Sequence, residues 1–135
     1  MLTAGTVLPP LRVEPVSRST LALFAGASGD HNPVHIDLDF AQAHGYDDVF
    51  AHGMLSMAWL GRLLTQWVEQ ARIRSFQVRF SAMTPVHGRP VCTGVVTTVA
   101  DGLATLDLTV RLDDGTTTLL GTATVVAAPT PGGTT

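Results

Sequence analysis

The strongest constraint on the fold is a strict alternation of apolar and polar residues near the end of the chain. Between residues 104 and 112, apolar side chains occupy every second position and polar ones fill the positions between them. Successive side chains of a β-strand point to opposite faces, so this pattern predicts a strand with one buried and one wet face. The apolar positions are Ala104, Leu106, Leu108, Val110 and Leu112. A half-buried strand of this kind is typical of an antiparallel sheet.

Turn signals on both sides of this strand extend the prediction to a sheet. Asp101-Gly102 precedes the strand and Asp113-Asp114-Gly115 follows it, and these residue types favour tight hairpin turns. We therefore expect consecutive strands joined by short connections. The expected ranges are one N-terminal strand within 5–16 and further strands near 72–83, 89–100, 103–112 and 117–127.

One long helix is predicted ahead of these strands, from Gly53 to about Gln70. Its first half is apolar on nearly all sides, whereas Arg62 and Glu69 give the second half a polar face. The apolar run is too short to span a membrane, so we expect a core helix with one deeply buried end. A long buried helix against an antiparallel sheet is an α+β layer arrangement.

Two short helices are expected before the long one. Ser17 and Ser19 are candidate N-caps of the first helix, which should end within residues 26–29. The second should begin at Asp37 or Asp39. These helices surround the segment with the richest chemistry in the chain.

Composition limits the classes of protein that fit. A chain of 135 residues, 45% hydrophobic and 14% charged, predicts one domain over residues 1–128 with more apolar surface than a monomer hides, so we expect an oligomer. The net charge of −3 argues against a nucleic-acid partner. One cysteine, Cys92, and the absence of a signal-peptide pattern in residues 1–11 favour a cytoplasmic location. Residues 129–135 are expected to form a disordered tail.

Side chains suited to proton transfer gather in one short segment. The stretch Gly29-Asp30-His31-Asn32-Pro33-Val34-His35 contains a carboxylate, an amide and two imidazoles. Pro33 removes a main-chain N–H and constrains the preceding residue toward extended geometry, which makes the bend rigid. Convergent polar groups on a rigid bend favour acid–base chemistry. By itself, the Asp-x-Asn-Pro pattern is also explained by a turn in which Asp30 and Asn32 bond their own backbone.

Together with a second segment, this stretch resembles a known family. Residues 25–35, Ala-Gly-Ala-Ser-Gly-Asp-His-Asn-Pro-Val-His, are similar to the signature of R-specific enoyl-CoA hydratases and MaoC-like dehydratases. The segment Ala51-His52-Gly53-Met54 resembles the family's second motif, at the start of the central helix of a hot-dog fold. The resemblance covers roughly residues 5–127 and implies an antiparallel sheet wrapped around that helix.

The resemblance implies reversible hydration of a trans-2-enoyl thioester to the R-3-hydroxyacyl thioester, with Asp30 and His35 as the catalytic dyad. Water loses a proton as it attacks C3 and C2 gains one, so two titratable groups that share one water can do both tasks. His35 is the better candidate for the base and Asp30 for the acid, while Asn32 would orient the water or the dyad. The backbone N–H of Gly53 is suited to receive the enolate oxygen.

The same resemblance places His52 and Met54 at the substrate-binding end of the site. For His52 a structural hydrogen bond is favoured over a chemical role. Met54 is favoured as a packing residue that can also line the acyl pocket. Gly61 stands where some relatives carry a hydroxyl residue near the thioester.

A metal centre is a rival use of the same residues. A two-His, one-carboxylate centre needs residue types that this region contains. Candidate ligands are Asp30, His31, His35, Asp37 and His52. Their spacing follows no recognised metal motif, so we expect a site without metal or other cofactor.

The sequence leaves open which group carries the acyl chain and which subunit pairs with this one. The acyl thioester is one of coenzyme A or of acyl carrier protein, so a 3-hydroxyacyl-ACP dehydratase is the nearest alternative. Some hot-dog subunits pair with a different subunit, so a homodimer and a heterodimer with this chain as the catalytic half are both expected assemblies. A non-catalytic acyl-thioester binder would have lost Asp30 or His35, and this chain retains both. Neither a nucleic acid nor a membrane is an expected partner.

Overall fold

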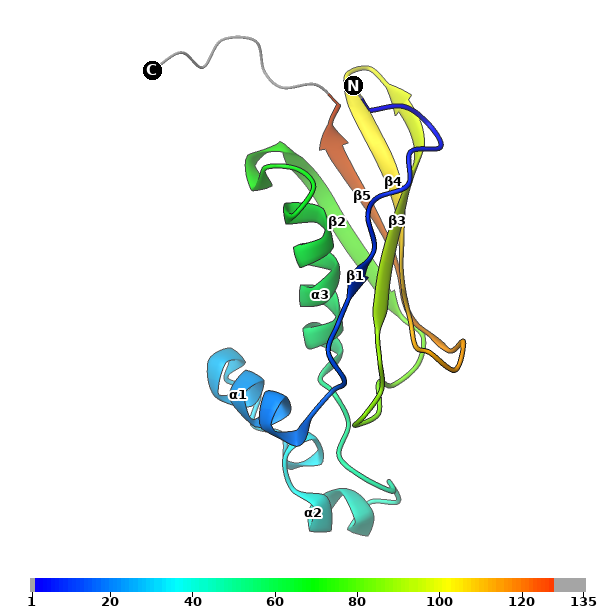
Figure 1. Cartoon of the computed structure of the whole chain (residues 1–135). Helices are drawn as coiled ribbons and strands as arrows, with labels where there is room; N and C mark the ends of the chain where they lie inside the picture. Colours follow the sequence, from blue (N-terminus) through cyan, green and yellow to red (C-terminus); the bar gives the residue numbers. More distant parts are fainter. Residues whose placement is uncertain (1, 128–135) are drawn as a thin grey trace.

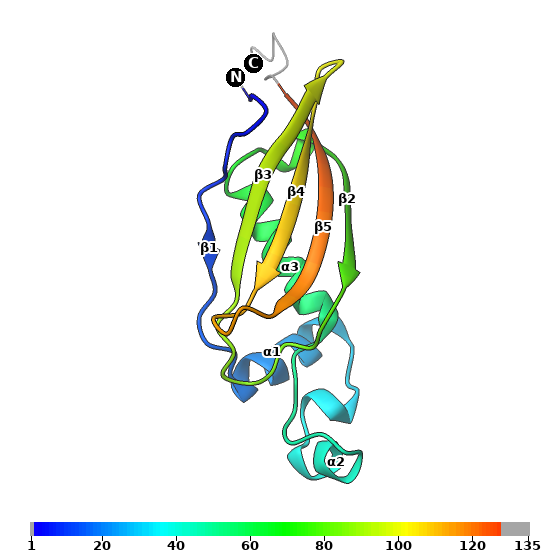
Figure 2. The same ribbon diagram turned by 90° about the vertical axis from the view of Figure 1, so that its right-hand side faces the viewer.

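An antiparallel sheet of five strands curves around one long helix (Figures 1 and 2). The computed structural model describes residues 2–127. The strands lie in the order β1-β3-β4-β5-β2, and they are β1 (Leu11–Arg12), β2 (Ile73–Phe80), β3 (Val91–Ala100), β4 (Leu103–Arg111) and β5 (Thr117–Val126). The helical segments are α1 (Arg18–Ser28), η1 (Pro33–His35), α2 (Leu38–Ala43), α3 (Gly53–Thr65) and η2 (Gln70–Arg72). This arrangement is a hot-dog fold, so the predicted α+β class is confirmed.

The core lies between α3 and the inner face of the sheet. The alternating apolar positions of β4 are buried as predicted, and Leu106 is 0% exposed. They belong to one cluster with Leu60, Leu63 and Leu64 of α3, and α3 contacts β1, β3, β4 and β5. Burying a side chain of this size contributes roughly 1.5–3 kcal/mol, so this interface is the main source of stability.

The tight turn between β3 and β4 explains the register of the sheet. Asp101 and Gly102 have φ values of 54° and 76°, the left-handed pair that a two-residue hairpin requires. Ala100 therefore pairs directly with Leu103. Residues 113–115 turn the chain again between β4 and β5, as predicted.

Two predicted boundaries differ from the structure. The long helix ends at Thr65 rather than near Gln70, because the chain turns there and buries Val68 in the core before β2 begins. No glycine or proline marks this turn. The periodicity of apolar residues therefore predicted a helix that extends past its observed end. The N-terminal strand is only two residues long, since prolines at 9, 10 and 15 lack the N–H that a longer ladder needs.

The short helices lie at the end of the molecule where α3 begins (Figure 1). The Ser17 side chain caps α1, and Gly29 ends it with a left-handed φ of 78°. Asp37 caps α2 by accepting from the main-chain N–H groups of Asp39 and Phe40. The segment between the two helices, which carries the first motif, is therefore held at the N-terminus of α3.

Some sequence predictions fall outside these elements. The expected tail, residues 129–135, lies outside the described residues, and a single domain over 1–128 stays a prediction. Among the described residues, no helix has the length and apolar character needed to cross a bilayer.

Candidate active site

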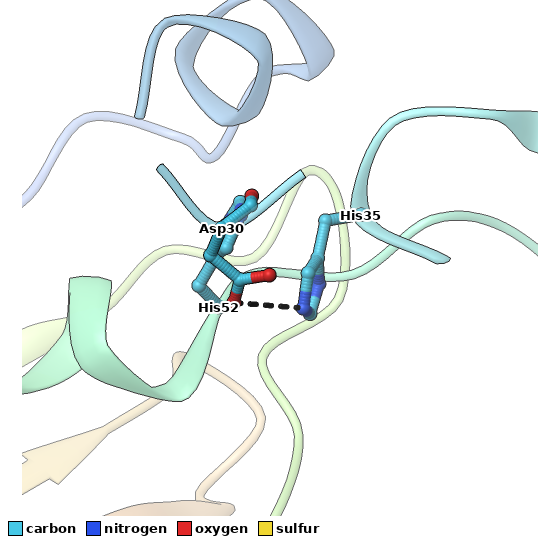
Figure 3. Close-up of side chains that lie close together, drawn as sticks. All are labelled: Asp30, His35 and His52. Carbon is cyan, nitrogen blue, oxygen red and sulfur yellow. Dashed lines mark hydrogen bonds and ion pairs between the residues drawn. The ribbon is translucent and has the colours of Figure 1, made fainter. Parts of the chain in front are cut away.

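The fold brings three polar side chains from the two motifs together (Figure 3). Asp30 follows α1, His35 ends η1, and His52 is the N-cap of α3. One potential ligand or proton-transfer atom of each residue lies within 4.8 Å of the others. The carboxylate is exposed, whereas both imidazoles are buried. Asp30 and His52 lie 22 positions apart in the sequence, yet they are neighbours in the fold. This proximity is expected if the two motifs form one site.

His35 has one ring nitrogen committed to the backbone. Its Nδ1 lies 2.8 Å from the carbonyl oxygen of Phe50. A carbonyl oxygen only accepts, so Nδ1 donates its hydrogen and neutral His35 carries its lone pair on Nε2. That nitrogen faces the Asp30 carboxylate. The backbone therefore determines which nitrogen of His35 can receive a proton.

The Asp30 carboxylate lies close to His35 without a direct hydrogen bond. Asp30 Oδ2 is 4.0 Å from His35 Nε2, the contact that the dashed line marks in Figure 3. This distance exceeds hydrogen-bond range, so a small molecule can interact with both groups. The other oxygen, Oδ1, accepts from the main-chain N–H of Asn32 at 3.2 Å. The turn holds the carboxylate in place while one oxygen stays available.

Asn32 has a clear local role. Its Oδ1 accepts from the N–H of Val34 at 3.2 Å and caps η1. Asp30 and Asn32 therefore both make the turn-forming bonds that the sequence alone allowed. This does not separate them from the site, because these bonds use only the carbonyl oxygen of Asn32. Its side-chain NH₂ group is a separate donor with which Asn32 can orient a bound molecule.

His52 forms the main-chain hydrogen bond that the sequence favoured. Its Nε2 lies 3.1 Å from the carbonyl oxygen of Asp30, and its side chain makes no capping bond to α3. The ring stacks on His35 with centroids 3.9 Å apart and planes inclined by 27°. Burial lowers the pKa of His52, the nearby His35 adds to this, and the Asp30 contacts only partly oppose it. His52 is thus held as a neutral imidazole.

Gly53 and Met54 begin α3 beside this cluster. As the first residue of the helix, Gly53 has a main-chain N–H that no carbonyl within α3 can accept. A Cβ on Gly53 would lie 2.9 Å from the Phe80 ring, so the absence of a side chain has a packing reason. Met54 is 58% exposed and is not a core residue in this chain. Its predicted packing role is therefore wrong for the single chain, because the N-terminal turn of α3 projects one face out of the core.

His35 and Gly53 line different cavities in the single chain. One cavity of about 290 Å³ is bordered by Gly53, Ser56, Phe80 and Met83. A second of about 570 Å³ is bordered by Asn32, His35 and Tyr46. Phe50 lines both cavities. It is therefore a shared neighbour of His35 and of the N-terminus of α3.

The geometry does not suit a shared metal ion. The lone pair of an imidazole lies in the ring plane, and metal–nitrogen bonds are about 2.0–2.1 Å long. Two rings stacked nearly parallel, as His35 and His52 are, do not direct their lone pairs at one point that close to both. Asp37 is occupied as the cap of α2. Three of the five candidate ligands come together, but their orientation favours proton transfer over coordination.

Sequence reasoning missed the phenylalanines around the dyad. Phe24 meets His52 edge-on at 4.9 Å, and Phe50 meets His35 edge-on at 5.1 Å. A row of four rings, Phe24–His52–His35–Phe50, therefore crosses the site. Phe50 directly precedes the second motif, which was an available signal. Phe24 lies in α1, five residues before Gly29. Its apolar character indicated only core packing.

Two arginines near the ends of β2 and β5 donate to the backbone. Arg72 donates twice to the carbonyl oxygen of Val126, at 3.1 and 2.7 Å. Arg74 donates to the carbonyl oxygen of Ala71 at 2.6 Å. Both guanidinium groups therefore have backbone partners and serve the ends of β2 and β5.

Comparison with known proteins agrees with the fold and identifies the family. A MaoC like domain matches residues 5–113, and the chain belongs to the MaoC-like dehydratase family. It is 32% identical over 102 residues to 3-hydroxyacyl-thioester dehydratase Z of Mycobacterium tuberculosis, covering 70% of this chain and 68% of that protein. Over a shorter stretch of 49 residues it is 43% identical to an (R)-specific enoyl-CoA hydratase of Rhodospirillum rubrum, covering 36% and 34% of the two chains. These relatives are hydratases and dehydratases, the class of enzyme to which this chain belongs.

Other relatives act as parts of larger assemblies. The chain is 32% identical over 114 residues to the 3-oxo-4,17-pregnadiene-20-carboxyl-CoA hydratase beta subunit of M. tuberculosis, covering 82% of this chain and 86% of that one. Its structure also superposes on a chain of the M. tuberculosis ChsH1-ChsH2 complex, with a TM-score of 0.84, 28% identity and coverage of 93% and 98%. Proteins similar to this chain therefore include members of heteromeric complexes.

Proposed function

We propose that this enzyme interconverts trans-2-enoyl-CoA and (R)-3-hydroxyacyl-CoA, with Asp30 and His35 as the catalytic dyad. The observation that carries this proposal is the arrangement of His35: its Nδ1 is bonded to a carbonyl and its Nε2 faces a carboxylate 4.0 Å away. A water or hydroxyl group between these atoms can exchange protons with both. Acid–base catalysis requires both groups to lie within hydrogen-bond reach of the reacting molecule. Asp30 and His35 can meet this requirement through one bridging water.

In the hydration direction, His35 Nε2 takes a proton from water while the water oxygen bonds to C3. A proton from the Asp30 carboxyl group goes to C2, and transfer from His35 back to Asp30 restores the starting state. In the dehydration direction the two groups exchange these roles, because the reaction is reversible. Asn32 orients the water or the dyad through its amide. The dyad lies on one side of the alkene, so addition is syn and gives the R product.

The thioester oxygen needs a hydrogen-bond donor as negative charge develops on it. The main-chain N–H of Gly53 is free of helical partners, and the N-cap side chain of α3 makes no bond to the first turn. The positive end of the helix dipole favours an oxyanion at this position. We therefore assign Gly53 to the thioester oxygen, and Met54 and His52 to its surroundings.

The enzyme works as a dimer of hot-dog subunits in this proposal. β2 is an edge strand of eight residues, and large apolar side chains are exposed beside it, with Phe80 53% and Met83 54% exposed. A long open edge with apolar neighbours is a site for strand pairing. The partner subunit would then complete the cavity that Gly53, Phe80 and Met83 border. We assign this completed cavity to the acyl chain.

A heterodimer is the second candidate, in which this chain is the catalytic subunit. It is favoured by similarity to a hydratase beta subunit and to a chain of a heteromeric complex. The acyl group can be carried by coenzyme A or by acyl carrier protein, and a dehydratase acting on 3-hydroxyacyl-ACP is the corresponding alternative.

The single cysteine, free and buried, fits a reducing cytoplasm.

The test is hydration of crotonyl-CoA and of a longer enoyl-CoA by the chain purified alone. Loss of the absorbance of the conjugated thioester reports the rate, and chiral analysis of the product formed in deuterated water reports the stereochemistry. We expect an R product, syn addition and a rate that chelators leave unchanged. An S product or anti addition would refute a shared water, and a rate that follows added Zn or Fe would revive the metal alternative. Activity that appears only with a second subunit would select the heterodimer.

A further inference from the structure

His52 is more deeply buried than either member of the dyad and contacts both. It is 1% exposed, its Nε2 lies 3.1 Å from the Asp30 carbonyl oxygen, and its ring stacks on His35 at 3.9 Å. Figure 3 shows the ring lying beside both residues. A residue that only caps a helix would make a side-chain bond to that helix, and His52 makes none. Its contacts are directed at the dyad.

The surroundings of both ring nitrogens determine the protonation state of His52. A carbonyl oxygen cannot donate, so the contact with Asp30 requires a hydrogen on Nε2. Nδ1 is buried, and within residues 2–127 it has no hydrogen-bond partner. A hydrogen there would be a buried donor with no acceptor, which is costly, and a positive charge would be costlier still. The neutral ring with its hydrogen on Nε2 is the one form that fits.

The neighbours of His52 support the same form. Its titratable contacts are His35, stacked on one face, and Asp30, reached through the backbone. The other flank is covered by the edge of Phe24, which is uncharged. When His35 holds a proton during turnover, a second positive charge on a stacked ring would oppose it. A permanently neutral His52 avoids this conflict.

We propose that His52 is a positioning residue for catalysis, which fixes the Asp30 main chain through the hydrogen bond that its Nε2–H donates. This inference rests on the proposed function. Asp30 follows the left-handed Gly29, which has open space around it and φ of 78°, so the loop needs a tether. The hydrogen bond from His52 joins that loop to the N-terminus of α3. It thereby sets the distance between the Asp30 carboxylate and the Gly53 N–H.

Two substitutions separate the hydrogen bond from the bulk of the ring. His52→Phe keeps a stacked ring and removes the donor, whereas His52→Gln keeps an N–H group near the position of Nε2 and removes the ring. We expect His52→Phe to lower kcat for enoyl-CoA hydration by about 10- to 100-fold, since displacement of a catalytic group by about 1 Å costs up to 100-fold. KM should stay within about threefold, and His52→Gln should recover kcat to within about threefold of the parent enzyme.

Each outcome decides between roles. Normal kcat in His52→Phe, a loss expressed mainly in KM, or no recovery in His52→Gln would overturn the positioning role. Circular dichroism and thermal melting establish that both variants fold. If the parent enzyme hydrates no enoyl thioester, the proposed function itself has failed, which is a different result from an active parent with an unaffected His52→Phe.

A measurement without substrate keeps the inference falsifiable if His52→Phe does not fold. In the parent chain labelled with ¹⁵N-histidine, the His52 signals are those absent from His52→Gln. We expect a neutral ring with hydrogen on Nε2 and a bare Nδ1 at about pH 7 to 8, and long-range ¹H–¹⁵N correlations report the tautomer. A hydrogen on Nδ1 within this range would overturn the inference.

Discussion

At the scale of single residues, the backbone decides what each imidazole can do. His35 and His52 both give a hydrogen to a main-chain carbonyl, but through different nitrogens: His35 uses Nδ1 and His52 uses Nε2. The free nitrogen of His35 consequently faces Asp30, while that of His52 is enclosed. Two stacked histidines therefore have different chemistry. In the proposed mechanism His35 exchanges a proton with substrate, whereas His52 stays neutral.

The dyad should behave as a unit. Asp30→Asn and His35→Ala should each lower kcat/KM by several orders of magnitude without unfolding the chain, because Asp30 is exposed and His35 lies at the end of a single turn. The double variant should be hardly worse than either single variant, since each loss alone disables the shared proton transfer. Steady-state kinetics on crotonyl-CoA provides the measurement. Independent, additive losses would contradict the shared mechanism.

His52 should make the fold sensitive to mild acid. Its pKa is lowered in the folded chain from an ordinary value of 6.5, so below about pH 6.5 the unfolded chain binds a proton that the folded chain does not. The contribution of neutral His52 to stability is therefore complete above pH 6.5 and declines as the pH falls, by at most about 1.4 kcal/mol per pH unit. Urea unfolding at pH 5 to 8 measures this. The stability advantage over His52→Gln should shrink in acid, and a constant difference would refute the linkage.

At the scale of elements, α3 combines two glycines with opposite consequences. Gly53 begins the helix against Phe80, and a Cβ there would lie 2.9 Å from the ring. Gly61 is in the interior of the helix, where a Cβ would be 3.8 Å from Phe76, an ordinary contact. One position restricts what can approach the helix N-terminus. The other only weakens the helix.

Alanine at these two positions should separate function from stability. Gly53→Ala should lower kcat/KM by about 10-fold or more, because the new methyl group occupies the approach to the main-chain N–H. Gly61→Ala should stabilise the fold by roughly 0.5–1 kcal/mol, as expected for an interior helical glycine. Kinetics and thermal melting measure both. Recovery of Gly53→Ala activity by Phe80→Leu would mean that displacement of Phe80, rather than exclusion of substrate, caused the loss.

At the scale of the whole molecule, the two edges of the sheet differ. β1 has two residues and is followed and preceded by prolines, whereas β2 is a continuous strand of eight residues. Apolar side chains are exposed near the end of β2 and the start of α3. One edge is thus poorly suited to pairing, and the other is suited to it.

Assembly should depend on the β2 side. Met83, 54% exposed just beyond β2, is expected at the contact, whereas Leu23, 75% exposed on α1, is expected outside it. Met83→Glu should therefore shift a dimer toward monomer and reduce activity, because the partner completes the acyl tunnel. Leu23→Glu should leave the mass unchanged, which light scattering after gel filtration measures. Dissociation by Leu23→Glu alone would place the contact on α1.

Most helices and strands, and the proximity of Asp30, His35 and His52, could be predicted from the sequence. Alternation in β4 and the Asp101-Gly102 turn predicted strands and register, since both depend on local periodicity and backbone preference. The two motifs predicted that residues near 30–35 and 51–54 would meet. The family resemblance supplied their chemistry, which spacing alone left open between a turn, a metal centre and a dyad.

Only the tertiary structure decided how those residues are oriented. The helix stops at Thr65 because Val68 turns into the core, although nothing local ends it there. The carbonyl of Phe50 selects the free nitrogen of His35, and the carbonyl of Asp30 selects that of His52. The Phe80 ring lies over Gly53 from a strand 27 residues later in the chain. These contacts depend on the packing of distant segments, whose positions follow from the whole core and not from any local pattern.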